Sequence, residues 1–138
     1  MGRTLLGIVL GIFAMWLTTS AVEFASHMLY PPPPGLDPQD PQSLAVMLAA
    51  APTAALVLLV TAWALGAFVG GGVAGRIARH PRIAATCVAL LTVAGVVGMI
   101  VIVPEHPTWV SALGLLLPVP AALFGAALAQ RREKTLPK

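Results

Sequence analysis

Residues 52–82 read PTAALVLLVTAWALGAFVGGGVAGRIARHPR, and this stretch decides what kind of protein the chain encodes. It carries no charged residue before Arg76, and it then ends in a cluster of arginines. A helix needs about 20 predominantly apolar residues to cross the hydrocarbon core of a membrane. We therefore predict a membrane-spanning helix over about residues 52–78, with its arginine-rich end at the membrane surface.

Three further stretches of the chain have the same apolar character. They cover about residues 5–30, 83–103 and 108–130. The chain of 138 residues is 58% hydrophobic and only 9% charged, with a mean hydropathy of +0.90, whereas a soluble domain is about 25% charged. This composition excludes a soluble globular domain and a nucleic-acid-binding protein. We expect one all-α domain over residues 1–138, a four-helix transmembrane bundle with up-down connections.

The longest connection, residues 31–51, joins the first two predicted spans on the outer side of the membrane. It opens with four consecutive prolines, which cannot continue a helix. Asp40 then precedes Pro41 and an apolar run, an order typical of a helix N-cap followed by a first turn. We predict a proline-rich outer loop followed by a short interfacial helix, which is too short to span the membrane. The alternative is that this helix extends the second span, with a kink at Pro52.

The basic residues predict the orientation of the chain in the membrane. With four spans, they all fall on the side of the two termini and of the loop between the second and third spans. They are Arg3, Arg76, Arg79, Arg82, Arg131, Arg132, Lys134 and Lys138. Most of the acidic residues fall toward the opposite side, namely Glu23, Asp37, Asp40 and Glu105.

Lys and Arg in short loops are retained on the cytoplasmic side of a membrane. We therefore predict a bacterial inner-membrane protein with both termini in the cytoplasm. Such a one-sided distribution argues against a dual-topology dimer, which needs almost no bias. The arginines of the cytoplasmic loop, Arg76, Arg79 and Arg82, are expected to contact anionic lipid headgroups.

The first span has a rival interpretation as a signal peptide. Arg3, the apolar run over residues 5–17 and the small residues that end at Ala21 resemble a signal sequence cleaved after Ala21. However, apolar residues continue through Phe24 up to the prolines. We therefore expect an uncleaved span.

Small residues gather in the second span, where glycines recur four positions apart. Gly66 and Gly70 form one such pair, and Gly71 and Gly75 form another. Helices in lipid associate through small residues, which let two backbones approach closely. The pattern predicts either tight packing within the bundle or self-association of the protein through this span.

The fourth span contains two prolines in its middle. Pro118 and Pro120 lack the N–H groups that a continuous helix needs, and they are expected to bend the helix there. Carbonyls freed in this way line ion sites in some transporters. A tolerated bend is the other interpretation.

One group of polar residues needs a separate explanation. Glu23 lies within the apolar part of the first span, although an acid costs about 2.5–3.5 kcal/mol at the membrane centre and less toward the rim. His27 follows one helical turn later, and Glu105 and His106 occupy the turn between the last two spans, on the same side. An up-down bundle brings both segments to one surface, so we predict a site there for a divalent metal such as zinc, or for a proton. The alternative is a structural cluster in which Glu23 and His27 bond to each other.

The chain contains no catalytic motif that we recognise. It has no GxSxG, P-loop or GxGxxG sequence, and its single cysteine excludes a disulfide framework. We therefore expect that it is not an enzyme. One predicted function is a non-catalytic module or accessory subunit that forms a homo-oligomer or joins a larger membrane partner. The alternative is a small transporter or sensor of a cation or proton at the predicted polar site.

Three segments of the chain are distinctive in combination. They are HMLYPPPPGLDPQDP at residues 27–41, AWALGAFVGGGVAGRIAR at residues 62–79 and LGLLLPVPAAL at residues 113–123. Together they resemble a family of uncharacterised small four-span inner-membrane proteins of bacteria. The resemblance extends over nearly the whole chain and implies a four-span topology and a bacterial origin. It implies no activity and no catalytic residue.

Overall fold

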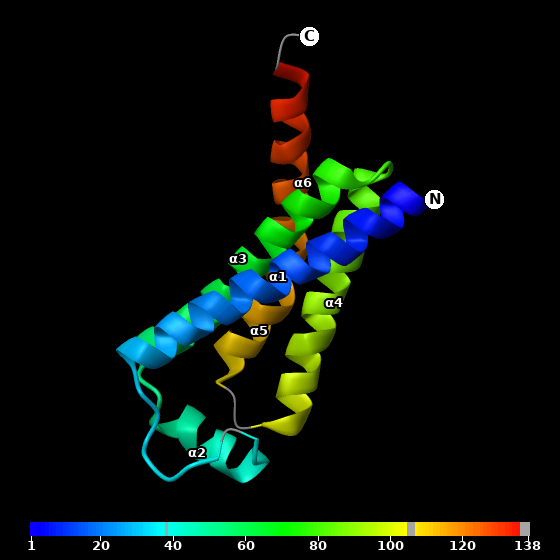
Figure 1. Ribbon diagram of the computed structural model, residues 1–138. Helices are drawn as coiled ribbons and strands as arrows, with labels where there is room; N and C mark the ends of the chain where they lie inside the picture. The colour runs from blue at the N-terminus through cyan, green and yellow to red at the C-terminus, as the bar shows by residue number, and fades with distance from the viewer. Residues whose placement is uncertain (38, 105–106, 136–138) are drawn as a thin grey trace.

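The computed structural model describes residues 1–37, 39–104 and 107–135. Within this part of the chain the only regular secondary structure is α-helix (Figure 1). The helices are α1 (Gly2–Leu29), α2 (Pro41–Ala50), α3 (Thr53–Ile77), α4 (Pro81–Ile102), α5 (Thr108–Leu116) and α6 (Pro118–Thr135). The predicted all-α fold is confirmed.

Four segments are long and apolar enough to cross a membrane. Three are the single helices α1, α3 and α4, and the fourth is the segment Thr108–Arg131, which α5 and much of α6 form together. The start of α1 and the end of α6 lie at one end of the bundle, which we call the terminal end, and α2 lies at the other, which we call the loop end (Figure 1). The predicted up-down bundle is therefore present, although its first helix begins at Gly2 instead of near residue 5.

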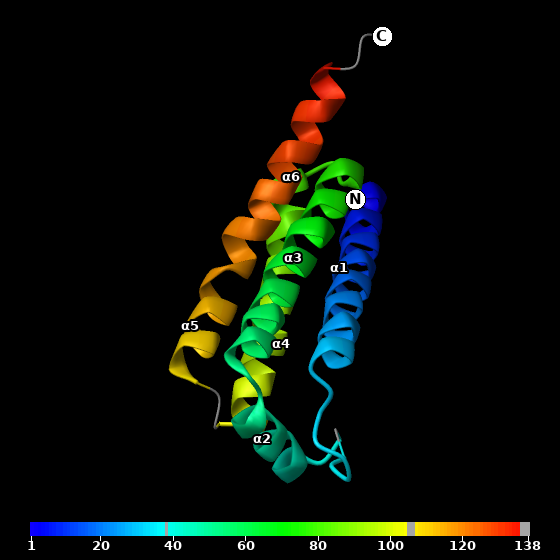
Figure 2. The ribbon, with the colours of Figure 1, turned by 90° about the vertical axis from the view of Figure 1, so that its left-hand side faces the viewer.

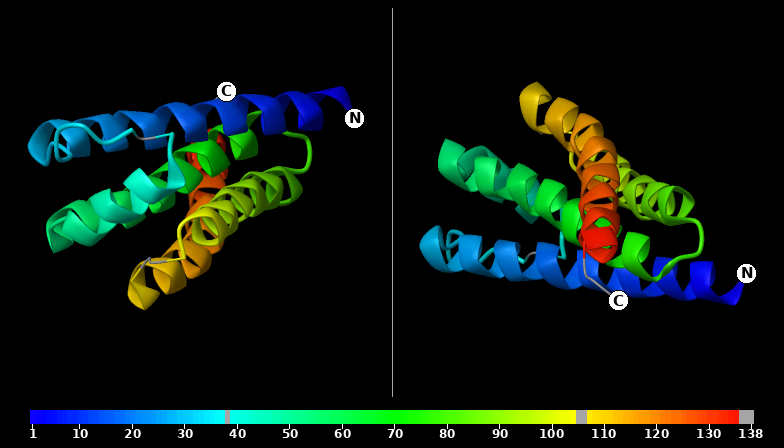
Figure 3. Two further views of the ribbon diagram at one scale, coloured as in Figure 1. Left: turned by 90° about the horizontal axis from the view of Figure 1, so that it is seen from below. Right: turned by 90° about the horizontal axis from the view of Figure 1, so that it is seen from above.

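Helix α3 is the central element of the bundle. It packs against α1, α4, α5 and α6, and Figure 2 shows it between α1 and the α5–α6 span. Views along the bundle show α1 on one side and the fourth span on the other (Figure 3). Accordingly, 44% of an 18-residue stretch of α3 is buried, against 11% of the corresponding stretch of α1. Most of the α1 surface is thus left for lipid.

Glycines let the α3 backbone touch two neighbouring helices. On the side of α1, a Cβ atom added to Gly70 would lie only 2.6 Å from the Gly11 carbonyl oxygen. On the side of α6, a Cβ atom added to Gly75 would lie only 2.6 Å from the Ala126 Cβ. Real Cβ atoms essentially never approach their neighbours this closely, so larger residues here would push the helices apart.

The glycines singled out in the sequence are all buried within one chain: Gly66, Gly70, Gly71 and Gly75. Gly66 faces Thr19 of α1, whose hydroxyl also donates to the Ala62 carbonyl of α3 at 3.3 Å. Gly71 faces the Ala122 backbone of α6. A second copy of the chain cannot reach these glycines unless α1 or α6 moves away. The glycine pairs therefore pack the bundle itself, and the predicted self-association would need a different surface.

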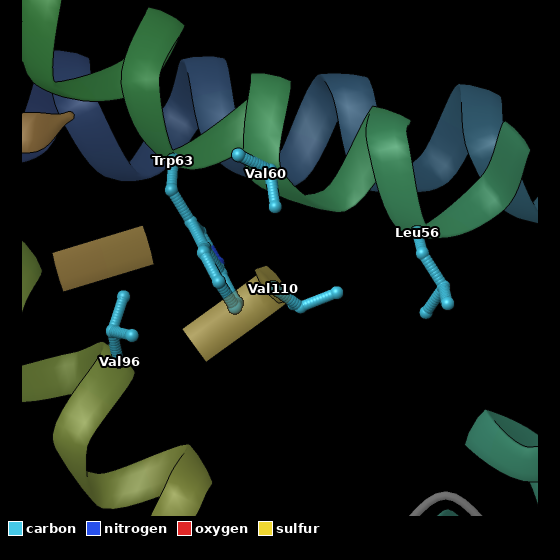
Figure 4. Packing of buried hydrophobic residues seen from close by; sticks show 5 residues of the cluster. All are labelled: Leu56, Val60, Trp63, Val96 and Val110. Atoms are coloured by element: carbon cyan, nitrogen blue, oxygen red, sulfur yellow. The ribbon is translucent and has the colours of Figure 1, made fainter. Parts of the chain in front are cut away.

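A hydrophobic cluster joins α3, α4 and α5 in the half of the bundle nearer to the loop end. Trp63 extends from α3 toward Val96 of α4 and Val110 of α5 (Figure 4). A Cβ atom added to Gly114 of α5 would lie 2.6 Å from the Trp63 ring, so this glycine makes room for the indole. Leu48 of α2 packs against the same cluster. Helix α2 is thereby attached to the membrane-spanning part.

The fourth span is bent at Leu117, as its prolines predict. Pro118 starts α6, and neither Pro118 nor Pro120 has an N–H to bond the turn before it. Leu117 itself keeps a helical conformation, and its carbonyl accepts a bond from the Ala121 N–H at 3.1 Å. Two helices therefore cross the membrane as one bent span.

Helix α2 is a separate short helix, as predicted, and not an extension of the second span. The Asp40 carboxylate caps it by accepting bonds from the Ser43 N–H and the Ser43 hydroxyl, each at 2.9 Å. Ala51 and Pro52 are extended, so the chain changes direction before α3 begins. The two bonds from Ser43 hold the pKa of the Asp40 carboxyl below its ordinary value, and the bond from the Ser43 backbone N–H has the largest effect.

The glycine contacts predict opposite effects for two alanine substitutions. Gly71→Ala should destabilise the bundle by about 1–3 kcal/mol, because its methyl group would collide with the α6 backbone. Gly95→Ala, on the exposed side of α4, meets no atom within 4 Å. It should stabilise by about 0.5–1 kcal/mol through helix propensity alone. Thermal unfolding of the two variants in one detergent gives the comparison. Equal melting temperatures would contradict the packing described here.

The Asp40 cap predicts a local effect on α2. Asp40→Ala should speed amide hydrogen exchange in the first turns of α2 at pH 7, measured by mass spectrometry of peptides. Because folding lowers the pKa of Asp40, the cap stabilises α2 above a pH of about 3.9. That stabilisation is lost as the pH falls through the lower pKa of the folded protein.

Asp37 is the matched control for this experiment, because it accepts a bond from the Gln39 N–H in the loop and caps no helix. Asp37→Ala should leave exchange in α2 unchanged. Equal exchange in α2 for both variants would show that Asp40 is not what stabilises its first turn.

Candidate functional site

A pocket of about 470 Å³ lies at the loop end of the bundle. Its walls come from the end of α1, the prolines that follow it, helix α2 and the start of α3, and α4 adds Met99. The prolines lead the chain away from α1, and α2 then lies at the loop end of the bundle (Figure 1), where its residues line the same pocket as those of α1 and α3. The proline-rich loop and the short helix, which the sequence predicts as separate surface features, therefore build one concave site.

Glu23 and His27 both line this pocket. They lie one turn apart on α1, so their side chains project from the same face of the helix. Glu23 is half-buried and His27 is exposed, and the two side chains are close enough for their charges to interact. Both residues therefore lie in the wall of one pocket, and the bond predicted between their side chains stays a prediction.

Ser26 adds a hydroxyl group to the same wall. Its side chain is only 9% exposed and lines the pocket. Among the described residues, the Ser26 hydroxyl has no hydrogen-bond partner, although the Ser26 carbonyl accepts a bond from the Tyr30 N–H at 2.8 Å. A buried hydroxyl without a partner is costly unless something else bonds to it, which a ligand in the pocket would do.

The rest of the lining is mainly aliphatic, thioether and aromatic. Leu48 of α2 and Leu56 of α3 contribute aliphatic surface, and Met47 and Met99 contribute thioethers. Tyr30 contributes an aromatic ring. No spacing in the sequence connects α2 or Met99 with Glu23, so these residues could not be assigned to the site beforehand.

The predicted metal site is represented only in part. Of its four residues, Glu23 and His27 share the pocket, whereas Glu105 and His106 lie outside the described residues. Within the described part of the chain, no three His, Cys, Asp or Glu side chains come together as metal ligands. A zinc site uses three or four protein ligands, so the two described donors are not enough for one.

The basic residues gather at the terminal end, away from this pocket. Arg3 lies at the start of α1, Arg76 near the end of α3 and Arg82 at the start of α4. Arg79 lies in the connection between α3 and α4, and all four of these arginines are accessible. The two ends of the bundle therefore differ in charge, with arginines at one and Glu23 at the other.

Comparisons with known proteins identify no relative of this chain. No protein-family model, no curated protein and no solved structure matches it. The resemblance to small four-span proteins of bacteria thus stays a prediction, and the function has to be argued from the geometry of the site.

Proposed function

We propose that this chain is a multi-pass protein of the bacterial inner membrane with both termini in the cytoplasm. The support is the gathering of arginines at the terminal end of a bundle with four apolar spans. Membrane insertion retains Lys and Arg of short loops in the cytoplasm. In this orientation the pocket with Glu23 opens on the outer side of the membrane, and α2 lies at that surface.

We further propose that the loop-end pocket binds a small organic cation, as the site of a transporter or sensor. The volume of the pocket carries this proposal. Pockets for small molecules measure about 300–1,000 Å³, and this pocket, at about 470 Å³, falls in that range. A bare ion or a proton needs far less space, so a ligand with a carbon skeleton fits better than the ions considered from the sequence.

Glu23 supplies the charge that would select a cation. Its carboxyl group is half-buried among apolar side chains, and attraction between opposite charges is stronger there than in water. Tyr30 offers an aromatic ring to the same ligand, and a cation over such a ring gains about 0.5–2 kcal/mol. Leu48 and Leu56 would bury the apolar part of the ligand.

Binding of tetraphenylphosphonium, an organic cation with an apolar body, tests this proposal. Glu23→Gln should weaken binding by about tenfold or more, which corresponds to a loss of about 1.4 kcal/mol or more. Asp37→Asn removes the same charge from an exposed loop position that does not line the pocket, so it should leave the affinity unchanged. Equilibrium dialysis of the protein in detergent micelles measures the three affinities.

Two results would overturn the organic-cation proposal. The first is an equal affinity of wild type, E23Q and D37N, which would place the bound cation outside the pocket. The second is thermal stabilisation by Zn²⁺ but not by tetraphenylphosphonium, lost in both E23Q and H27A. That result would support the metal site predicted from the sequence.

The proposed orientation predicts which positions are accessible from outside the cell. In a Cys87→Ser background, a cysteine at Gln39 should react with a membrane-impermeant maleimide in intact cells, because Gln39 is exposed in the outer loop. A cysteine at Gly2, which has open surroundings at the other end of α1, should react only after the membrane is permeabilised. The opposite pattern would invert the topology and place the pocket in the cytoplasm.

A further inference from the structure

A second pocket lies at the terminal end, between the first turn of α4 and one face of α6. Its volume is about 610 Å³. Two arginines, one glutamine and three apolar residues line it: Arg82, Leu123, Ala126, Ala127, Gln130 and Arg131. The described residues that line it do not include any that line the loop-end pocket, so the proposal made for this pocket is independent of the organic-cation proposal.

The α6 residues of this second pocket form one stripe along the helix. They recur at positions i, i+3, i+4, i+7 and i+8 starting from Leu123, a spacing that places them on a single helical face. At 1.5 Å per residue the stripe is about 12 Å long. It is apolar from Leu123 to Ala127 and polar at Gln130 and Arg131. Since α6 runs toward the terminal end, the polar part lies nearer to the membrane surface.

Positive charge is concentrated at the polar part of the stripe. Arg82 is the second residue of α4 and faces the same pocket as Arg131. The N-terminus of α4 adds the partial positive charge of a helix dipole, and its N-cap residue, His80, makes no side-chain capping bond there. Helix N-termini bind phosphate groups for this reason. None of the described residues that line this pocket is acidic.

The apolar part of the stripe is open to the membrane. Leu123 is 37% exposed, and Ala127 is also exposed. In a bilayer, these side chains contact acyl chains. A free phosphate ion could use only the polar part of the pocket. A phospholipid matches both parts, because its phosphate lies at the membrane surface and its acyl chain lies deeper in the membrane, as the polar and apolar residues of the stripe do.

We propose that the pocket between α4 and α6 binds one anionic phospholipid molecule. Its phosphate group lies between Arg82 and Arg131, and one acyl chain lies against Leu123 and Ala127. The site differs from the general attraction of a basic loop to anionic lipids, because Arg76 and Arg79 of that loop do not line it.

The proposal can be tested by native mass spectrometry of the full chain. Phosphatidylglycerol is added to the protein in detergent, and the bound lipid is measured after the protein is released from the micelles. Replacing Arg82 and Arg131 together by Gln should weaken binding of this lipid about tenfold or more, since charge-assisted bonds to its phosphate are lost. Replacing Arg76 and Arg79 together by Gln removes the same net charge and should change the affinity little. Phosphatidylethanolamine with the same acyl chains should bind weakly to wild type, and excess inorganic phosphate should not displace phosphatidylglycerol.

A second variant tests the apolar part without changing any charge. Ala127→Trp fills the stripe at an exposed position, so it should reduce phosphatidylglycerol binding while thermal stability in detergent stays unchanged. If the two double-arginine variants lost equal affinity for phosphatidylglycerol, the lipid would be attracted to the basic end as a whole, and the proposal would be overturned. It is also overturned if inorganic phosphate displaces the lipid, if both lipids bind equally, or if Ala127→Trp binds like wild type.

Discussion

The contact of the α3 backbone with the helices on both sides of it is the interaction on which the rest of the structure depends. Apolar side chains gain nothing by leaving lipid for another helix, so a membrane bundle is stabilised by van der Waals contact at short distance. Glycines occupy two faces of α3, and they bring Gly11 of α1 and Ala126 of α6 into such contact. One helix thereby sets the positions of two others.

The two pockets at opposite ends of the bundle follow from this arrangement. Because α1 is held against α3, Glu23 and His27 share one pocket with residues of α2 and of the start of α3. Because α6 is held against α3 and packs beside α4, Arg131 comes to the same pocket as Arg82. The chain thus presents a half-buried acid with apolar walls at one end and arginines above an apolar stripe at the other.

Features that depend on a few neighbouring residues could be predicted from the sequence. The spans follow from runs of apolar residues, the α2 cap from Asp40 and Pro41, and the bend at Leu117 from Pro118. The candidate site was predictable only as far as it lies on one helix, with Glu23 and His27 a turn apart. The walls made by α2, Met99 and α3 were not, because nothing local relates them to Glu23.

The sequence by itself determined the all-helical, four-span topology, because hydropathy and the length of each apolar run are properties of single segments. It left two roles open for the glycine pairs, close packing within the bundle or self-association. Only the tertiary structure decided between them for Gly70 and Gly75, by placing α1 and α6 against them. The tertiary structure alone also shows that the proline-rich loop and α2 form part of the wall of a pocket. Both outcomes depend on which helices become neighbours, and hydropathy patterns do not specify that.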